Sequence, residues 1–215
     1  MVFSEQAIEA LIHGFLISIT IITSVGPQNA YVIRYGLAKR FVPYVLLTCI
    51  LSDFILFGIG VYGTAEIFER YYYSGLVVGI CGILFLLYCS FDNFKSAFGK
   101  DEDFHIGSRV SDSLKRAILQ GLAFAFLNPA AIMDTVVIVG GVSSQYETDD
   151  ETLLYFIGAA LASITWFTSI GLFTKILYPY FQKPISWKIL DFISGTIMLL
   201  IAYFLADGLY EKFCL

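Results

Sequence analysis

A chain of 215 residues that is 58% hydrophobic and only 14% charged lacks the composition of a soluble domain, in which about a quarter of the residues are charged. Its apolar residues come in long blocks with short connections, which excludes a separate soluble catalytic or ATP-hydrolysing domain. No GxxxxGK[ST] motif is present. The formal net charge of −5 combines basic and acidic connections and by itself points to no partner.

Taken in chain order, six apolar blocks are each long enough to cross a bilayer, which needs about 20 mostly apolar residues in a helix. The short alternating segments of a transmembrane barrel are absent. No Lys or Arg precedes the first block, so we interpret it as a helix of the protein and not as a cleaved signal peptide. We therefore predict an all-α integral membrane protein with six transmembrane helices. The blocks are 7–36, 42–65, 72–97, 116–143, 152–178 and 187–208.

Most basic residues lie in the connections after the first, third and fifth blocks or at their edges. Positive connections are retained in the cytoplasm, so both termini are expected on the opposite, periplasmic or extracellular side. The basic residues concerned are Arg34, Lys39, Arg40, Lys95, Lys100, Arg109, Lys115, Arg116, Lys175, Lys183 and Lys188.

The first and fourth blocks share an interruption, Gly26-Pro27 in one and Asn128-Pro129 in the other. Proline removes a backbone donor inside a helix and suits the first position of a new one. We therefore predict that helices 1 and 4 are broken at proline, although prolines that only kink two continuous helices are the alternative. Because each half has an odd number of helices, the halves form a 3+3 inverted repeat. The predicted units are a first three-helix repeat at 1–98, a charged cytoplasmic loop at 99–113 and a second repeat at 114–215.

The two new helix N-termini are expected to meet near the middle of the membrane, with the amides of Gln28, Asn29 and Asn128 beside them. The positive ends of helix dipoles hold anionic substrate groups in inverted-repeat transporters. This arrangement predicts a binding site for a carboxylate.

Two carboxylates, Asp53 and Asp134, lie deep in the second and fourth blocks, and no Lys or Arg lies at their depth. An ionised Asp at a helix centre costs about 2.5–3.5 kcal/mol, so a cationic ligand or a proton would complete such a site. The alternative is that Ser, Thr or backbone groups satisfy each Asp and that it binds nothing. Asp92, Asp191 and Asp207 lie nearer block ends, where we expect solvation among head groups.

The segments VGPQNAYVIRYGLAKR, CILSDFILFGIGVYG and FLNPAAIMDTVVIVGGVSSQY, in this order, resemble the LysE family of basic amino acid exporters. The resemblance covers nearly the whole chain. It implies export of L-lysine or L-arginine across the bacterial inner membrane, driven by protons or the membrane potential. It also assigns functional weight to one set of residues: Gly26, Pro27, Gln28, Asn29, Asp53, Asn128, Pro129, Asp134 and Thr135.

The resulting hypothesis is a secondary-active exporter and not an enzyme, with no cofactor and no bound metal. The substrate would contact Gln28, Asn29, Asp53, Asn128, Asp134 and Thr135. Asp53 or Asp134 would alternate between a proton and the substrate, while Gly26, Pro27 and Pro129 form the helix breaks or hinges. The expected partners are a basic amino acid and membrane lipid but no nucleic acid, and a homo-oligomer is compatible with the sequence.

Other functions remain open at this point. One is the export of another amino acid or of a divalent metal cation, because carboxylates and amides supply hard oxygen ligands. A membrane thiol-redox carrier is a further alternative, although none of the four cysteines lies near Pro27 or Pro129. A non-transporting assembly subunit would leave the two buried acids unexplained.

Overall fold

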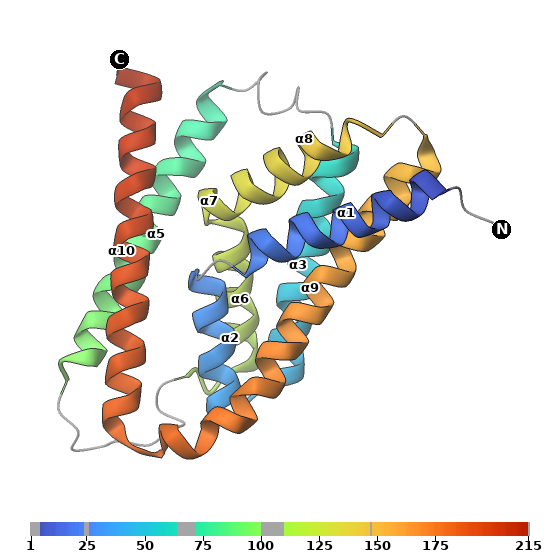
Figure 1. Ribbon diagram of the computed structural model, residues 1–215. Coiled ribbons are helices and arrows are strands. Elements are labelled where there is room, and N and C mark those ends of the chain that lie inside the picture. The colour runs from blue at the N-terminus through green and yellow to red at the C-terminus, as the bar shows by residue number, and fades with distance from the viewer. Residues whose placement is uncertain (1–4, 24–25, 64–71, 100–109, 147, 215) are drawn as a thin grey trace.

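The computed structural model describes residues 5–23, 26–63, 72–99, 110–146 and 148–214, with most of their side chains (Figure 1). Every element in these ranges is helical, which confirms the prediction of an all-α chain. Four of the described helices are long and apolar enough to cross a membrane, namely Glu5–Ile22, Val42–Tyr62, Asp149–Phe181 and Pro184–Phe204.

The described part of the first half of the chain contains three long helices and one short helix, α2. The first apolar block forms two of them, with an interruption between Ile22 and Pro27. Gly26 caps the second in an extended conformation, and Pro27 occupies its first turn, where a missing N–H costs nothing. The helices of this half are α1 (Glu5–Ile22), α2 (Pro27–Leu37), α3 (Val42–Tyr62) and α5 (Tyr72–Ala97).

The second half is less regular. Its first apolar block is divided between an α-helix that ends at Phe126 and a helical run that begins at Pro129 and includes a π-helix. Long helices follow, joined by a short 3₁₀ segment. The elements are α6 (Leu114–Phe126), α7 (Pro129–Ile132), η2 (Met133–Val139, π-helical), α8 (Gly140–Ser143), α9 (Asp149–Leu177), η3 (Tyr178–Gln182, 3₁₀) and α10 (Pro184–Cys214).

Figure 1 shows α5 and α10 side by side as one pair, while α1 lies along α9. In this view α2, α5 and α9 end at the bottom, where α3, α6 and α10 begin. We call this the basic end, because most of the Lys and Arg residues lie in the connections there or in the helix turns next to them. Lys39 at this end stacks over the ring of Tyr178, 3.4 Å from its centroid.

The close approach of α1 to α9 depends on two glycines. A methyl group on Gly14 would meet the Tyr155 carbonyl oxygen at 2.0 Å, and one on Gly158 would meet the Leu11 carbonyl oxygen at 2.0 Å. Small residues allow membrane helices to pack backbone against backbone in this way. The contact fixes α1 against α9, and so positions the end of α1 that precedes the break.

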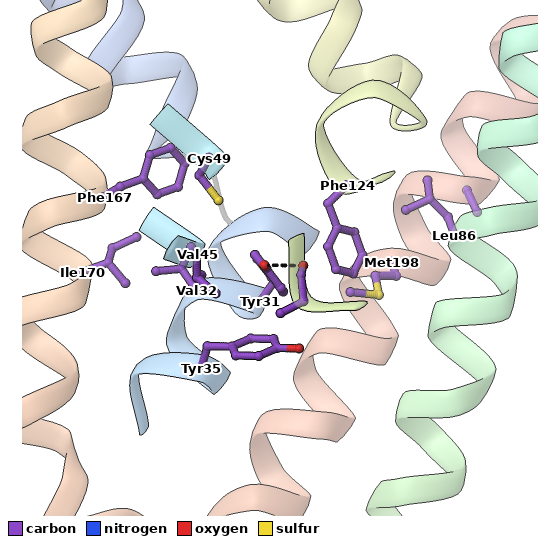
Figure 2. Close-up of a cluster of buried hydrophobic side chains, with 12 residues drawn as sticks. Tyr31, Val32, Tyr35, Val45, Cys49, Leu86, Phe124, Phe167, Ile170 and Met198 are labelled. Carbon is purple, nitrogen blue, oxygen red and sulfur yellow. Dashed lines mark hydrogen bonds between the residues drawn. The ribbon is translucent and has the colours of Figure 1, made fainter. Parts of the chain in front are cut away.

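An apolar core surrounds α2 (Figure 2). Tyr31 packs edge-on against Tyr35 and also contacts Phe124 of α6. Its hydroxyl donates to the Ala117 carbonyl oxygen at 2.7 Å, the bond that is dashed in Figure 2. Since this bond joins the first half of the chain to the second, it holds α2 beside α6 directly below the break.

Candidate functional site

A cavity of about 290 Å³ lies where the ends of the interrupted helices meet. Segments from both halves of the chain line it, together with the middle of α3. The lining includes seven of the residues that the sequence analysis named: Gly26, Pro27, Gln28, Asn29, Asp53, Asn128 and Thr135. Apolar side chains such as Leu56, Phe167 and Ile201 form the rest of the wall.

The N-terminus of α2 opens onto this cavity. No side chain caps it, and the first bond within the helix is donated by the Ala30 N–H to the Gly26 carbonyl oxygen at 3.2 Å. The N–H groups of a first helical turn have no partners within the helix and carry a partial positive charge. The cavity wall at Gln28 and Asn29 therefore favours an anionic group.

The Asn29 side chain bridges the break between α1 and α2. Its Nδ2 donates to the Ile22 carbonyl oxygen at 3.0 Å, one of the carbonyls left open at the end of α1. Its Oδ1 accepts from Nε1 of Trp166 on α9 at 3.1 Å. Both ends of the amide are thus engaged, and Asn29 links three helices at the cavity wall.

Two other amides have atoms without a hydrogen-bond partner among the described residues. Nε2 of Gln28 and Oδ1 of Asn128 are both buried and unsatisfied. Gln28 is nevertheless close enough to interact with the Asp53 carboxylate. A buried polar atom left unpaired costs about 1–3 kcal/mol, so a ligand that supplied an acceptor and a donor here would gain that energy.

Asp53 lies in the middle of α3 and is 6% exposed. Its Oδ2 accepts a hydrogen bond from the hydroxyl of Ser163 on α9 at 2.8 Å. Within the described part of the chain, no Lys, Arg or His forms an ion pair with it. The carboxylate is therefore hydrogen-bonded but not neutralised, beside a cavity that could admit a cation.

The other predicted site residues are placed less completely. Thr135 is buried in η2 and its hydroxyl donates to the Ala131 carbonyl oxygen of its own helical run. The backbone of Asp134 also belongs to η2, and Pro129 begins α7, but both side chains lie outside the described part of the structure.

One expectation from the sequence is wrong. Asp191 is not solvated near a block end but is 1% exposed, because Arg34 of α2 forms an ion pair with it at 2.9 Å. Asp191 also accepts a hydrogen bond from Ser96 at 2.7 Å, and Arg34 donates to Asn93. Spacing along the chain could not reveal a contact between helices so far apart in sequence.

The sequence analysis included neither Ser163 nor Trp166 among the site residues. The two residues are three positions apart on α9, so they face the same direction. Ser163 reaches Asp53 and Trp166 reaches Asn29. Other polar side chains lie nearby on α9, including Thr165 and Ser169, so spacing alone could not have selected these two.

Nothing in the described residues gathers three or more His, Cys, Asp or Glu side chains into a metal site. Cys49 and Cys89 are free thiols. The geometry instead offers a carboxylate, amides and an open helix N-terminus around one cavity, a donor set suited to a small molecule with charges of both signs.

Comparisons with known proteins identify similar chains. Residues 19–208 match a family model described as "LysE type translocator". A lysine exporter LysE from Corynebacterium diphtheriae is 31% identical, with 88% of this chain and 95% of that protein aligned. An arginine exporter protein ArgO from Pectobacterium atrosepticum is also 31% identical, with 91% and 95% aligned. No solved structure matches.

Proposed function

The chain belongs to the LysE type translocator family, and from this premise we propose that it exports the basic amino acids L-lysine and L-arginine. The family consists of translocators, so the protein is a multi-pass membrane transporter and not an enzyme. The observation that carries the proposal is the single cavity in which Asp53, Gln28 and Asn128 meet the N-terminus of α2.

The α-carboxylate of the substrate would bind at the N-terminus of α2. There the first-turn N–H groups have no side-chain cap, and Nε2 of Gln28 is a buried donor that no described acceptor meets in good hydrogen-bond geometry, although the Asp53 carboxylate is near. Oδ1 of Asn128 would accept from the α-ammonium group. The bonds to the two amides would satisfy atoms that lack a well-placed hydrogen-bond partner among the described residues.

The cationic side chain of lysine or arginine would face Asp53. A carboxylate that is 6% exposed and has only Ser163 as a described hydrogen-bond donor of good geometry is costly to keep ionised, and a bound cation would remove that cost. Asn29 would act by holding the break in place, since Ile22 and Trp166 already engage both ends of its amide. Thr135 and Asp134 would complete the site from η2.

Transport would use the two interrupted blocks. We interpret the chain as six transmembrane helices in a 3+3 inverted repeat, 1–98 and 114–215 around the loop 99–113, in the bacterial inner membrane. In Figure 1, α2 runs from the break before Pro27 toward the basic end, and the run from α7 to α8 leads obliquely away from that end, which supports this interpretation. The basic end would face the cytoplasm and both termini the periplasm.

Coupling would occur at Asp53 or Asp134. One of them would bind a proton after the substrate leaves and release it before the next substrate binds, so that proton entry drives export. The carboxylate could then bind either a proton or the substrate, but not both at once. An antiport cycle requires this mutual exclusion.

Uptake into inside-out vesicles tests the proposal, with radiolabelled lysine, arginine, leucine and glutamate and with Mn²⁺ as alternatives. We expect lysine and arginine uptake that an imposed pH gradient accelerates and that Asp53→Asn abolishes. Asp207→Asn, which removes an exposed carboxylate of α10, is the matched control and should transport normally. Uptake of leucine or Mn²⁺ in preference to both basic amino acids would contradict the proposed substrate class.

A further inference from the structure

A second cavity, of about 160 Å³, lies between α2, α5, α6 and α10 on the side of the break toward the basic end. Pro27 lines both this cavity and the central one, so only the first turn of α2 separates them. Four of its lining residues, Tyr31, Tyr35, Phe124 and Met198, belong to the core around α2 that Figure 2 draws. A substrate that moved from the basic end to the central cavity would pass this position.

Two charged side chains, one basic and one acidic, line this second cavity. Arg34 lines it, but its charge is offset by the buried Asp191 at 2.9 Å. Asp92 of α5 lines it as well and makes no hydrogen bond or ion pair with any other residue that the structure describes. Since Arg34 is paired with Asp191, the exposed carboxylate of Asp92 is the charged group of this lining that remains available to a cationic ligand.

The remaining wall suits an organic cation better than a metal ion. Tyr35 and Tyr88 line the cavity, and the faces of aromatic rings attract guanidinium and ammonium groups. Gln120 adds an amide oxygen, which the Tyr35 hydroxyl approaches to 3.4 Å. One carboxylate among aromatic rings is too few hard ligands for a divalent ion, which takes six or more oxygens.

We propose that this second cavity is a loading subsite, in which Asp92 binds the guanidinium or ammonium end of a basic amino acid before the substrate enters the central cavity. The proposal rests on the proposed function and adds a residue that the central cavity does not contain. It assigns Asp92 to capture and Asp53 to the transport step itself.

Initial rates of arginine uptake into inside-out vesicles test this assignment. Asp92→Asn should raise KM about tenfold, the effect of losing one charged contact, and leave the maximal rate within about twofold of the unmodified protein. Asp112→Asn is the matched control, because Asp112 is an exposed carboxylate at the same end, paired with Arg40 and 84% exposed. An unchanged KM in Asp92→Asn, or an equal rise in Asp112→Asn, would overturn the proposal.

Agmatine allows binding at the loading subsite to be measured independently of transport, because it keeps the guanidinium of arginine but lacks the carboxylate. Calorimetry on purified Asp53→Asn protein should detect agmatine binding, and the added Asp92→Asn change should abolish it. Binding that survives the added change would refute the subsite even if arginine is exported. Conversely, wild-type vesicles that transport no basic amino acid would refute the proposed function, while the agmatine titration would still decide the role of Asp92.

Discussion

The two proline breaks differ in how they are held. At the first, Asn29 donates to the open Ile22 carbonyl and accepts from Trp166, so one amide joins α1, α2 and α9. At the second, Oδ1 of Asn128 is buried without a described partner. Similar sequence signals, an amide beside a proline, therefore occur at one break that side chains close and at one break that no described side chain closes.

The helical segments that follow the two breaks also differ, and the segment after the second break is again the less regular one. α2 is a regular helix of 11 residues, whereas α7 has only 4 residues and passes into a π-helix of 7 residues. π-Helical segments are rare and are frequent at functional sites. We therefore expect the first break to act as a fixed frame for the cavity, and the second to be the side that adapts when substrate binds.

The largest difference between the breaks should appear in Asn29→Ala. It leaves the Ile22 carbonyl and the Trp166 N–H unpaired, which should cost about 1–3 kcal/mol for each buried group and reduce export about 100-fold. Asn128→Ala removes an amide oxygen without a described partner and should leave the melting temperature closer to that of the unmodified protein. Thermal unfolding and uptake rates should be measured on both variants. A lower melting temperature for Asn128→Ala than for Asn29→Ala would contradict the claim that side chains hold the first break more firmly.

A methyl group added where α1 crosses α9 tests whether this contact fixes the position of α1. Gly158→Ala places a carbon 2.0 Å from the Leu11 carbonyl oxygen, so α1 must move, at a cost of about 1–3 kcal/mol. Gly141→Ala on α8 is the control, because a methyl group there meets nothing within 4 Å. Melting temperatures in detergent should fall for Gly158→Ala alone, and equal values for the two variants would show that the crossing does not fix α1.

Ser163→Ala tests whether α9 positions the carboxylate of Asp53. Losing the 2.8 Å bond to the carboxylate should lower the uptake rate about tenfold, the typical effect of a hydrogen bond to a charged group. Ser169→Ala is matched to it on the same helix, because the Ser169 hydroxyl donates only to the Thr165 carbonyl oxygen at 2.6 Å. If both variants transported equally, Ser163 would have no part in positioning Asp53.

The smallest expected effect is that of Trp166→Phe, which keeps an aromatic ring but removes the donor to Asn29. One neutral hydrogen bond is worth about 1 kcal/mol, so we expect about a fivefold loss of uptake rate. A double-mutant cycle with Asn29→Ala should be non-additive, because each change removes the same 3.1 Å contact. Additive losses would mean that Trp166 does not act through Asn29.

Several residues that line the central cavity were among the predicted site residues, because the constraints on them are local. Proline is disfavoured in the interior of a helix but tolerated in its first turn. The residue type therefore accounts for the two helices that begin at Pro27 and at Pro129. A carboxylate in the middle of an apolar block requires partners, which identified Asp53 before its surroundings were known. Gln28, Asn29 and Asn128 then line the same cavity because they adjoin those prolines.

Contacts between distant helices could not be predicted in this way. Ser163 is one of several serines in apolar blocks, and only the packing of α9 against α3 selects it for Asp53. Asp191 is buried through Arg34, a partner more than 150 positions away in the chain. The π-helix at Met133–Val139 has no residue signature of its own and follows from how the second half packs.

The most direct measurement compares the binding of arginine and of citrulline, its neutral isostere, to purified protein by calorimetry. If Asp53 is the counter-charge for the cationic side chain, the unmodified protein should prefer arginine about 100-fold, and Asp53→Asn should reduce that preference to less than about fivefold. Asp207→Asn should keep the full preference. An Asp53→Asn protein that still prefers arginine about 100-fold would contradict this role of Asp53.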